Sequence, residues 1–137
     1  MSNTIIPAYP VPLIDKAQAL LFERSPTLMQ RAGYRVSHAR ELVKLGKVEP
    51  AFGAWDDCDH RYYVQSEYGL HKYYVDMTAH ACTCLDAEAG HVQFRRGAQT
   101  IVICEHRIAV KIVEIIRHEL HFTPLVEQMQ AEAEVDA

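Results

Sequence analysis

Apolar side chains cover most of the circumference of a helix that we predict from Arg107 to about His121. The apolar positions of this helix are Ile108, Ala109, Val110, Ile112, Val113, Ile115, Ile116 and Leu120. Its polar positions form one stripe at steps of four, three and four, namely Arg107, Lys111, Glu114 and His118. A helix with so narrow a polar stripe has to be buried on most sides. We therefore expect it at the centre of a small core, or partly in the interface of a homodimer.

A second helical pattern begins at Ser25 and Pro26, which suit the N-cap and the first helical position. Apolar residues recur at roughly helical spacing as far as Leu45, and Gly46 is a suitable C-terminal cap. The basic residues of this region, set against a single Glu41, are Arg31, Arg35, Arg40, Lys44 and Lys47. Because Arg31, Arg35 and His38 recur at steps of four and three, we expect them on one face, away from the apolar stripe. Such a stripe is most simply a solvated surface.

The first residues show a different pattern. Residues 5–12 contain three prolines at short intervals, which excludes a regular helix there and predicts an extended arm that packs on this chain or on a second copy. A short helix is predicted over residues 15–24, which follow this arm.

Strict alternation replaces the helical period after Pro50. Tyr62, Val64 and Ser66 alternate with polar or outward positions, and Tyr73 and Val75 repeat the pattern after a turn at residues 67–69. Strong strand formers around a short turn predict a β-hairpin. Phe52 and Trp55 are expected in a further extended stretch before it.

These patterns together predict an α+β fold in one small domain, with N-terminal helices, a β-hairpin and a hairpin-helix unit. We expect an extended arm at 1–13, a helical segment at 14–56, the hairpin-helix module at 57–122 and an acidic tail at 123–137. The tail carries acids and no Lys or Arg after Leu125. A chain of 137 residues is long enough for one ordinary core.

Composition narrows the class of protein. The apolar fraction is 49% and the charged fraction 23%, as in soluble globular proteins, and no apolar run approaches the roughly 20 residues of a membrane helix. The first residues lack the features of a signal peptide, so we expect a cytoplasmic protein with no membrane partner. The formal net charge of −4 argues against a general nucleic-acid coat protein, although a local basic face can still bind phosphate.

Two tight pairs of metal-ligand residues stand out, Cys82-Thr83-Cys84 and Cys104-Glu105-His106. In a reducing compartment such pairs indicate a metal site rather than disulfides. Structural zinc takes four thiolate or imidazole ligands in a tetrahedron. The spacing therefore predicts one Zn²⁺ ion that joins the end of the hairpin to the first turn of the helix, where unpaired backbone N–H groups can donate to thiolates.

At these residues the chain resembles the SWIM-type zinc finger, whose signature is Cys-x-Cys, a spacer, then Cys-x-His. The hairpin residues Tyr62, Val64, Ser66, Tyr73, Val75 and Asp76, and the apolar helix after His106, also resemble that family. The resemblance covers about residues 62–116, and residues 39–48 look like the lead-in of small prokaryotic SWIM proteins. Two positions depart from the family. Leu85 stands where a proline is common, and Glu105 stands where a basic residue is common; neither position is a metal ligand.

Other interpretations of these residues remain open. Cys58 and His60 form a second Cys-x-His pair that could supply ligands together with Cys82 and Cys84, and the cysteines could also be ordinary small core residues. His118 and His121 superficially resemble a zinc-peptidase helix, but they are three residues apart rather than four, so the two-ligand face is missing.

A closed four-ligand site has no position for substrate, and no Gly-rich phosphate loop is present, so we do not expect an enzyme. The SWIM resemblance implies protein-binding or DNA-binding roles in recombination, transposition or transcription. We expect a protein-interaction adaptor. The alternative is a direct DNA-binding protein, which would use the basic helix 31–47 and the spacer loop. The candidate phosphate contacts are Arg31, Arg35, Lys44, Lys47, Arg95, Arg96, Arg107 and Lys111.

Overall fold

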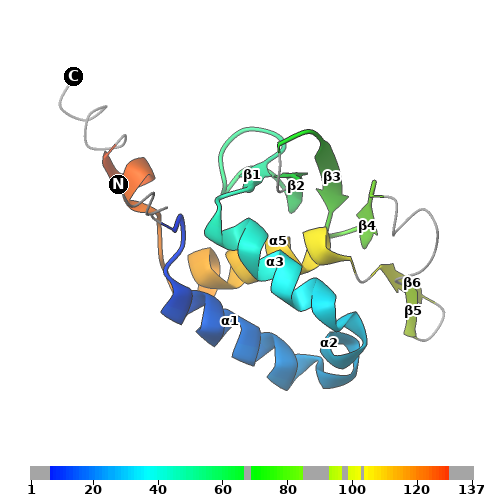
Figure 1. Ribbon diagram of the computed structural model, residues 1–137. Helices are drawn as coiled ribbons and strands as arrows, with labels where there is room; N and C mark the ends of the chain where they lie inside the picture. Colours follow the sequence, from blue (N-terminus) through cyan, green and yellow to red (C-terminus); the bar gives the residue numbers. More distant parts are fainter. Residues whose placement is uncertain (1–6, 67–68, 85–92, 97–98, 103, 130–137) are drawn as a thin grey trace.

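The computed structural model describes residues 7–66, 69–84, 93–96, 99–102 and 104–129, with side chains outside residues 85–103. The first helices are α1 (Val11–Arg24), α2 (Pro26–Ala32) and α3 (Tyr34–Lys44). A four-stranded sheet follows, made of β1 (Val48–Pro50), β2 (Arg61–Gln65), β3 (Lys72–Asp76) and β4 (Ala81–Cys82). The later elements are β5 (Gln93–Arg96), β6 (Gln99–Val102), the helix α5 (Glu105–Glu114) and the π-helix η1 (Ile115–Glu119). The helices gather on one side of the sheet, and this arrangement confirms the expected α+β class (Figure 1).

The sheet is built on the predicted hairpin. β2 and β3 pair antiparallel with Tyr62 opposite Val75 and Tyr63 opposite Tyr74. Alternation along β2 buries Tyr62 and Val64, while Tyr63 faces the other side of the sheet. β1 extends the sheet beyond β2 and β4 extends it beyond β3. The stretch with Phe52 and Trp55, expected to be extended, is instead a loop with turns between β1 and β2.

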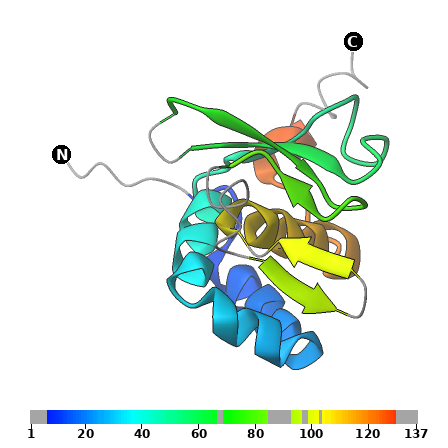
Figure 2. The same cartoon turned by 90° about the vertical axis from the view of Figure 1, so that its right-hand side faces the viewer.

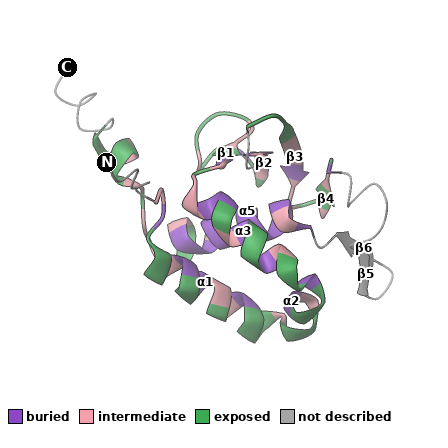
Figure 3. Cartoon of the chain, viewed as in Figure 1, coloured by how far each residue is buried: buried purple, intermediate pink, exposed green. Residues whose placement is uncertain are grey.

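The helix α5 lies at the centre of the core, as its pattern predicts. It packs along α3 on one side and under the sheet on the other, and Ile112 and Val113 are fully buried. Figure 3 shows most of α5 in the colour of buried residues. Because this chain itself covers the apolar face of α5, that face offers little to a homodimer interface.

The N-terminal arm is shorter than expected. Its last residues form the first turn of α1, which begins at Val11 with Pro12 in that turn. Proline is tolerated there because the first N–H groups of a helix have no intrahelical acceptor. Before the helix, Tyr9 is buried and the Ala8 amide donates to the carbonyl oxygen of Lys44 at 2.8 Å. The described part of the arm therefore packs on its own chain.

The helix expected over residues 26–45 is two helices. Gly33 has a φ of 57°, in the left-handed region that favours glycine, and it separates α2 from α3. As a result, Arg31 and Arg35 belong to different helices, and the expected single basic stripe is wrong.

Ion pairs hold η1, the π-helix that continues α5 at its C-terminal end. Arg24 of α1 forms two hydrogen bonds with Glu119 of η1. Arg117 of η1 donates to Glu127 and to the hydroxyl of Tyr9, and its guanidinium stacks over the ring of Trp55 at 4.0 Å. No helix in the described ranges is long and apolar enough to cross a membrane.

Candidate metal centre

Cys82 and Cys84 flank a single residue at the end of β4, and two local hydrogen-bond sets position them. Asp76, the last residue of β3, accepts hydrogen bonds from the Thr78 amide and hydroxyl and from the Ala79 amide, at 2.6–3.1 Å. These bonds form the turn that leads to β4, and they hold the pKa of the Asp76 carboxyl below its usual value, the Thr78 hydroxyl having the largest effect.

Thr83 anchors the Cys-x-Cys segment to β3. Its amide donates to the Tyr74 carbonyl oxygen at 3.1 Å, and its hydroxyl accepts from the Tyr74 amide at 3.0 Å. Since alternate residues of an extended segment point to opposite sides, anchoring Thr83 outward directs Cys82 and Cys84 to the same inner side.

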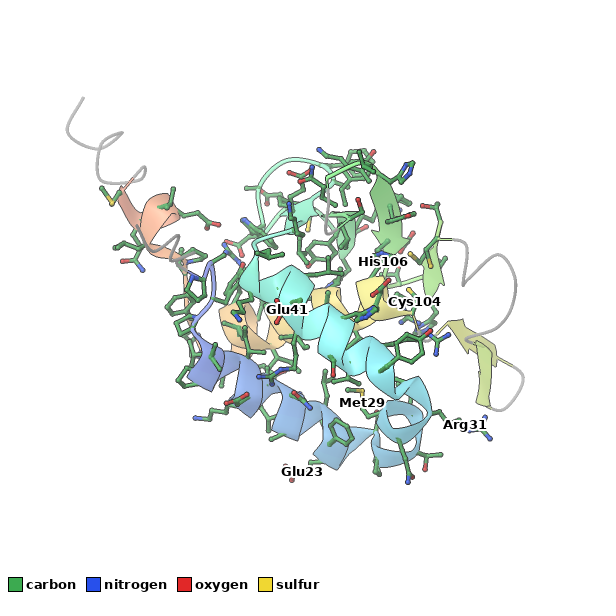
Figure 4. All side chains as sticks on the ribbon, in the orientation of Figure 1. Glu23, Met29, Arg31, Glu41, Cys104 and His106 are labelled. Carbon is green, nitrogen blue, oxygen red and sulfur yellow. The ribbon has the colours of Figure 1, made fainter. Side chains whose placement is uncertain are left out.

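Cys104 and His106 belong to the start of α5. Cys104 is the N-cap residue with extended backbone angles, and its sulfur accepts a hydrogen bond from the Arg107 amide at 3.4 Å. His106 lies in the first turn and is 6% exposed, while Cys104 is fully buried. Figure 4 shows both side chains at the N-terminal end of α5, beside the strands that end in β4. A sulfur at this position meets the positive end of the helix dipole, which stabilises a thiolate.

The four side chains come together as a compact donor set. The sulfurs of Cys82, Cys84 and Cys104 and one ring nitrogen of His106 all lie within 4.8 Å of one another. The Cys82 sulfur is 3.8 Å from Nδ1 of His106. Tetrahedral zinc, with bonds of about 2.3 Å to sulfur and about 2.0 Å to nitrogen, needs neighbouring ligand atoms roughly 3.5–3.8 Å apart. The donor types and spacing therefore fit a metal ion such as Zn²⁺.

The pKa values of the thiols reflect the same crowding of sulfurs. Contact with Cys104, then contact with Cys84, then burial raise the pKa of Cys82. At Cys104, contact with Cys82 lowers the pKa, but contact with Cys84 and burial outweigh it and raise the pKa to about 12. Three thiols this close, two of them buried and Cys82 half-buried, resist ionising together, and a divalent metal ion would offset the charge of their thiolates.

Arg107 places a positive charge beside the sulfurs. Its side chain is buried, and one of its terminal nitrogens lies 3.0 Å from Nδ1 of His80. Burial lowers the pKa of the guanidinium, while Cys104 and Cys82 act in the opposite direction. Three thiolates and Zn²⁺ carry a combined charge of −1, so the Arg107 guanidinium would neutralise the centre.

Tyr73 and Glu105 lie next to the His106 ring. The Tyr73 ring packs on it at a centroid distance of 4.3 Å. On the other side, Nε2 of His106 is 3.9 Å from a Glu105 oxygen, and the second Glu105 oxygen is 2.9 Å from Nδ1 of His38 on α3. At 3.9 Å the Glu105 carboxylate does not hydrogen-bond to the ring, but through His38 it connects the start of α5 to α3.

The alternative ligands lie elsewhere. Cys58 is buried and donates to the Trp55 carbonyl oxygen at 3.4 Å, while His60 lies 2.8 Å from Glu114. In the described part of the chain, no second group of three or more Cys, His, Asp or Glu side chains lies close enough to hold a metal. Cys58 is thus an ordinary small core residue, and His118 and His121 are exposed.

The proposed phosphate contacts do not form one described surface. Arg31 and Lys111 are exposed, Arg35 is half-buried, and Lys44 lies 3.7 Å from Glu41. Arg107 is buried beside the sulfurs, so its position in the expected polar stripe of the helix did not predict its environment. Lys47 is half-buried, and the side chains of Arg95 and Arg96 lie outside the described residues.

The sequence predicted which four side chains come together but not the residues that surround them. The surrounding residues are Tyr73, Thr83 and Arg107. Of these three, only the position of Tyr73 could have been predicted, because alternation along the strand places it on the same face as Val75. A scan against protein-family models gave no match, and neither did searches of curated proteins and of solved structures.

Proposed function

We propose that this chain is a zinc-binding module of the SWIM type that acts as a non-catalytic protein-interaction adaptor. The observation that carries the proposal is the Cys₃His donor set, formed by the end of a β-hairpin and the N-cap of the central helix. Zn²⁺ suits three sulfurs and an imidazole better than the hard cations do, because Mg²⁺ and Ca²⁺ prefer oxygen ligands.

A zinc ion in this set would be structural. Cys82, Cys84, Cys104 and His106 supply all four positions of a tetrahedron, so no position is left for water or substrate. What the ion supplies is folding free energy, about 10–16 kcal/mol apparent in small zinc modules. Here it would join β4 to α5, two elements that are far apart in the sequence.

The adaptor part of the proposal is supported by the short helix at residues 125–129. Leu125, Val126 and Met129 are 67%, 66% and 60% exposed. Glu127 holds this helix on the protein through its contact with Arg117, while the exposed Gln128 makes a local bond to the Thr123 carbonyl oxygen at 2.6 Å. Leu125, Val126 and Met129 are thus exposed on a helix that is attached to the protein, and grouped exposed apolar side chains are typical of protein contacts.

The metal part is tested by elemental analysis of protein purified without chelator. Close to one zinc per chain is expected, and Cys104→Ser should lose the zinc and unfold the hairpin-helix core. Cys58→Ser is the matched control, because that thiol is equally buried but outside the donor set, and it should keep full zinc content. Zinc-free protein with an unchanged melting temperature would refute the proposal.

The adaptor and DNA-binding interpretations are separated by gel-shift assays with duplex and single-stranded DNA at two salt concentrations. An adaptor gives no shift at either concentration. Direct phosphate binding gives a complex that weakens steeply with salt. If such a complex formed, replacing Arg31 and Arg35 together would lower the logarithmic salt slope by up to about two units.

A further inference from the structure

A row of aromatic rings crosses the face of the four-stranded sheet that points away from the helices. Tyr63 and Tyr74 are paired across β2 and β3, with ring centroids 5.8 Å apart. Phe52, from the loop after β1, continues the row at 6.4 Å from Tyr74 and is 53% exposed. We call Phe52, Tyr74 and Tyr63 the aromatic row.

The helices do not cover this row. α5 contacts the strands from the opposite face, where Tyr62, Val64 and Val75 are buried. Figure 2 shows α1, α3 and α5 together on one side of the sheet. Aromatic rings in contact with one another on an open sheet face form a flat apolar surface, which is a common site for binding a partner.

The charges around the row are predominantly acidic. The two cations of β2 and β3 are already paired, because Lys72 binds Glu49 at 2.6 Å and Arg61 lies 3.7 Å from Asp76. The loop that carries Phe52 adds three exposed acids and no Lys or Arg, namely Asp56, Asp57 and Asp59. Asp57 lies close to the residue that follows Phe52, since a Cβ atom on Gly53 would be 3.7 Å from the Asp57 Cβ. Phosphate is disfavoured at such a surface, whereas a cation is favoured.

The chain itself shows how a cation sits on this surface. The Lys72 ammonium lies 5.9 Å from the centre of the Tyr63 ring while it pairs with Glu49. A ring face next to a carboxylate is therefore already used to hold a lysine at one end of the row. At the Phe52 end, Asp57 lies near Gly53, the residue after Phe52, and the loop at 51–60 contains no Lys or Arg.

We propose that the aromatic row, with the aspartates beside it, binds a lysine- or arginine-bearing segment of a partner protein; this inference rests on the proposed adaptor function. Cations lie over the rings, as Lys72 does, and pair with Asp56 and Asp57. Cation–π contacts at exposed sites contribute roughly a factor of two to five each in affinity, so two rings account for about tenfold.

The test is fluorescence anisotropy at low salt with a labelled peptide in which arginine alternates with glycine. A glutamate-glycine peptide of equal length is the charge control, and labelled oligothymidylate represents nucleic acid. Replacing Tyr63 and Tyr74 by Thr removes both rings, keeps a strong strand former at each position and leaves the net charge unchanged. Tyr34→Thr is the matched control, because Tyr34 is 62% exposed but lies on α3, away from this face.

The expected result is that the basic peptide binds, that Tyr63→Thr with Tyr74→Thr weakens it about tenfold, and that Tyr34→Thr leaves it unchanged. Asp56→Asn with Asp57→Asn should also weaken binding, whereas Glu132→Gln with Glu134→Gln, the same charge change in the tail, should not. Three results would each overturn the inference. They are equal peptide binding by the Tyr63/Tyr74 variant and the Tyr34 variant, no binding of the peptide at all, or binding of oligothymidylate through Tyr63 and Tyr74.

Zinc content separates this inference from the proposed function. If the ring variants keep one zinc per chain and still bind the peptide normally, only the inference fails. Peptide-induced shifts of the Tyr74 and Thr83 amides in wild-type protein provide a second readout that needs no variant. Amide shifts confined to other parts of the chain would also overturn the inference.

Discussion

Replacing Tyr62 by Phe tests the contact that joins the sheet to the central helix. The Tyr62 side chain is almost fully buried, and its hydroxyl donates to Oε2 of Glu114 on α5 at 2.8 Å. Burial, then the charge of Glu114, raises the pKa of the tyrosine, so the hydroxyl stays protonated and remains a donor across the working pH range. The change to Phe removes the oxygen and leaves the packing of the ring intact.

The expected loss follows from the environment of the acceptor. A hydrogen bond to a charged group contributes about 1.5–3 kcal/mol. Glu114 keeps His60 as a second partner at 2.8 Å, and its side chain is 11% exposed, so it is not left buried and unpaired. We therefore expect a loss at the lower end, about 1.5–2 kcal/mol. For a chain of this size that lowers the melting temperature by about 5–10 °C.

The assay is urea unfolding of the zinc-loaded protein at pH 7, with thermal unfolding alongside. Tyr63→Phe is the matched control, because the neighbouring ring lies on the outer face, and its loss should stay within about 0.5 kcal/mol. In a Glu114→Ala background, the effect of Tyr62→Phe should also fall to about 0.5 kcal/mol or less, since the acceptor is gone. Equal effects of the Tyr62 and Tyr63 changes would refute the reasoning.

Two further predictions concern the backbone and a turn. Gly46→Ala should lower the free energy of unfolding in urea by about 1–2 kcal/mol, because φ is +70° and the new methyl would lie 3.0 Å from the Ala8 Cβ. Gly53→Ala is the control, and it should lower the free energy of unfolding less, because φ is +65° but the nearest atom lies at 3.7 Å. NMR titration should place the pKa of Asp76 below 3.8, since the Thr78 hydroxyl and nearby amides stabilise the carboxylate. This stabilisation of the folded state is complete above about pH 4 and is lost as pH falls through the lower folded pKa. The stability of Asp76→Asn should therefore lack this part of the pH dependence. An ordinary pKa at Asp76 would contradict the turn geometry.

The features that sequence predicted are those set by local periodicity and ligand spacing. Alternation at Tyr62 and Val64 predicted both the hairpin and its buried face. The apolar circumference of the last long helix predicted its central position. The pairs around Thr83 and Glu105 predicted which four side chains come together, because few arrangements of two such pairs suit a metal.

The features that sequence did not predict depend on tertiary context or on positions with two permitted conformations. Gly33 fits a helix at some cost or a left-handed break, and the structure has the break. Pro12 suits an extended arm or a first helical turn, and the structure has the turn. Arg107 follows the polar stripe of its helix, yet the packing of α5 places it inside, beside sulfurs that offset the cost of burying its charge.

Cys104 is both the N-cap of α5 and a member of the donor set, and these two roles have a joint consequence for how the chain opens. The other end of the same helical stretch is fixed independently, by the contacts of Arg24 with Glu119 and of Arg117 with Glu127. A chelator that withdraws the ion should therefore raise amide hydrogen exchange first in the opening turn of α5, and the increase should diminish toward η1. Oxidation of this one thiol would have the same directional effect, so the central helix would begin to open at its N-terminal end before its C-terminal end opens.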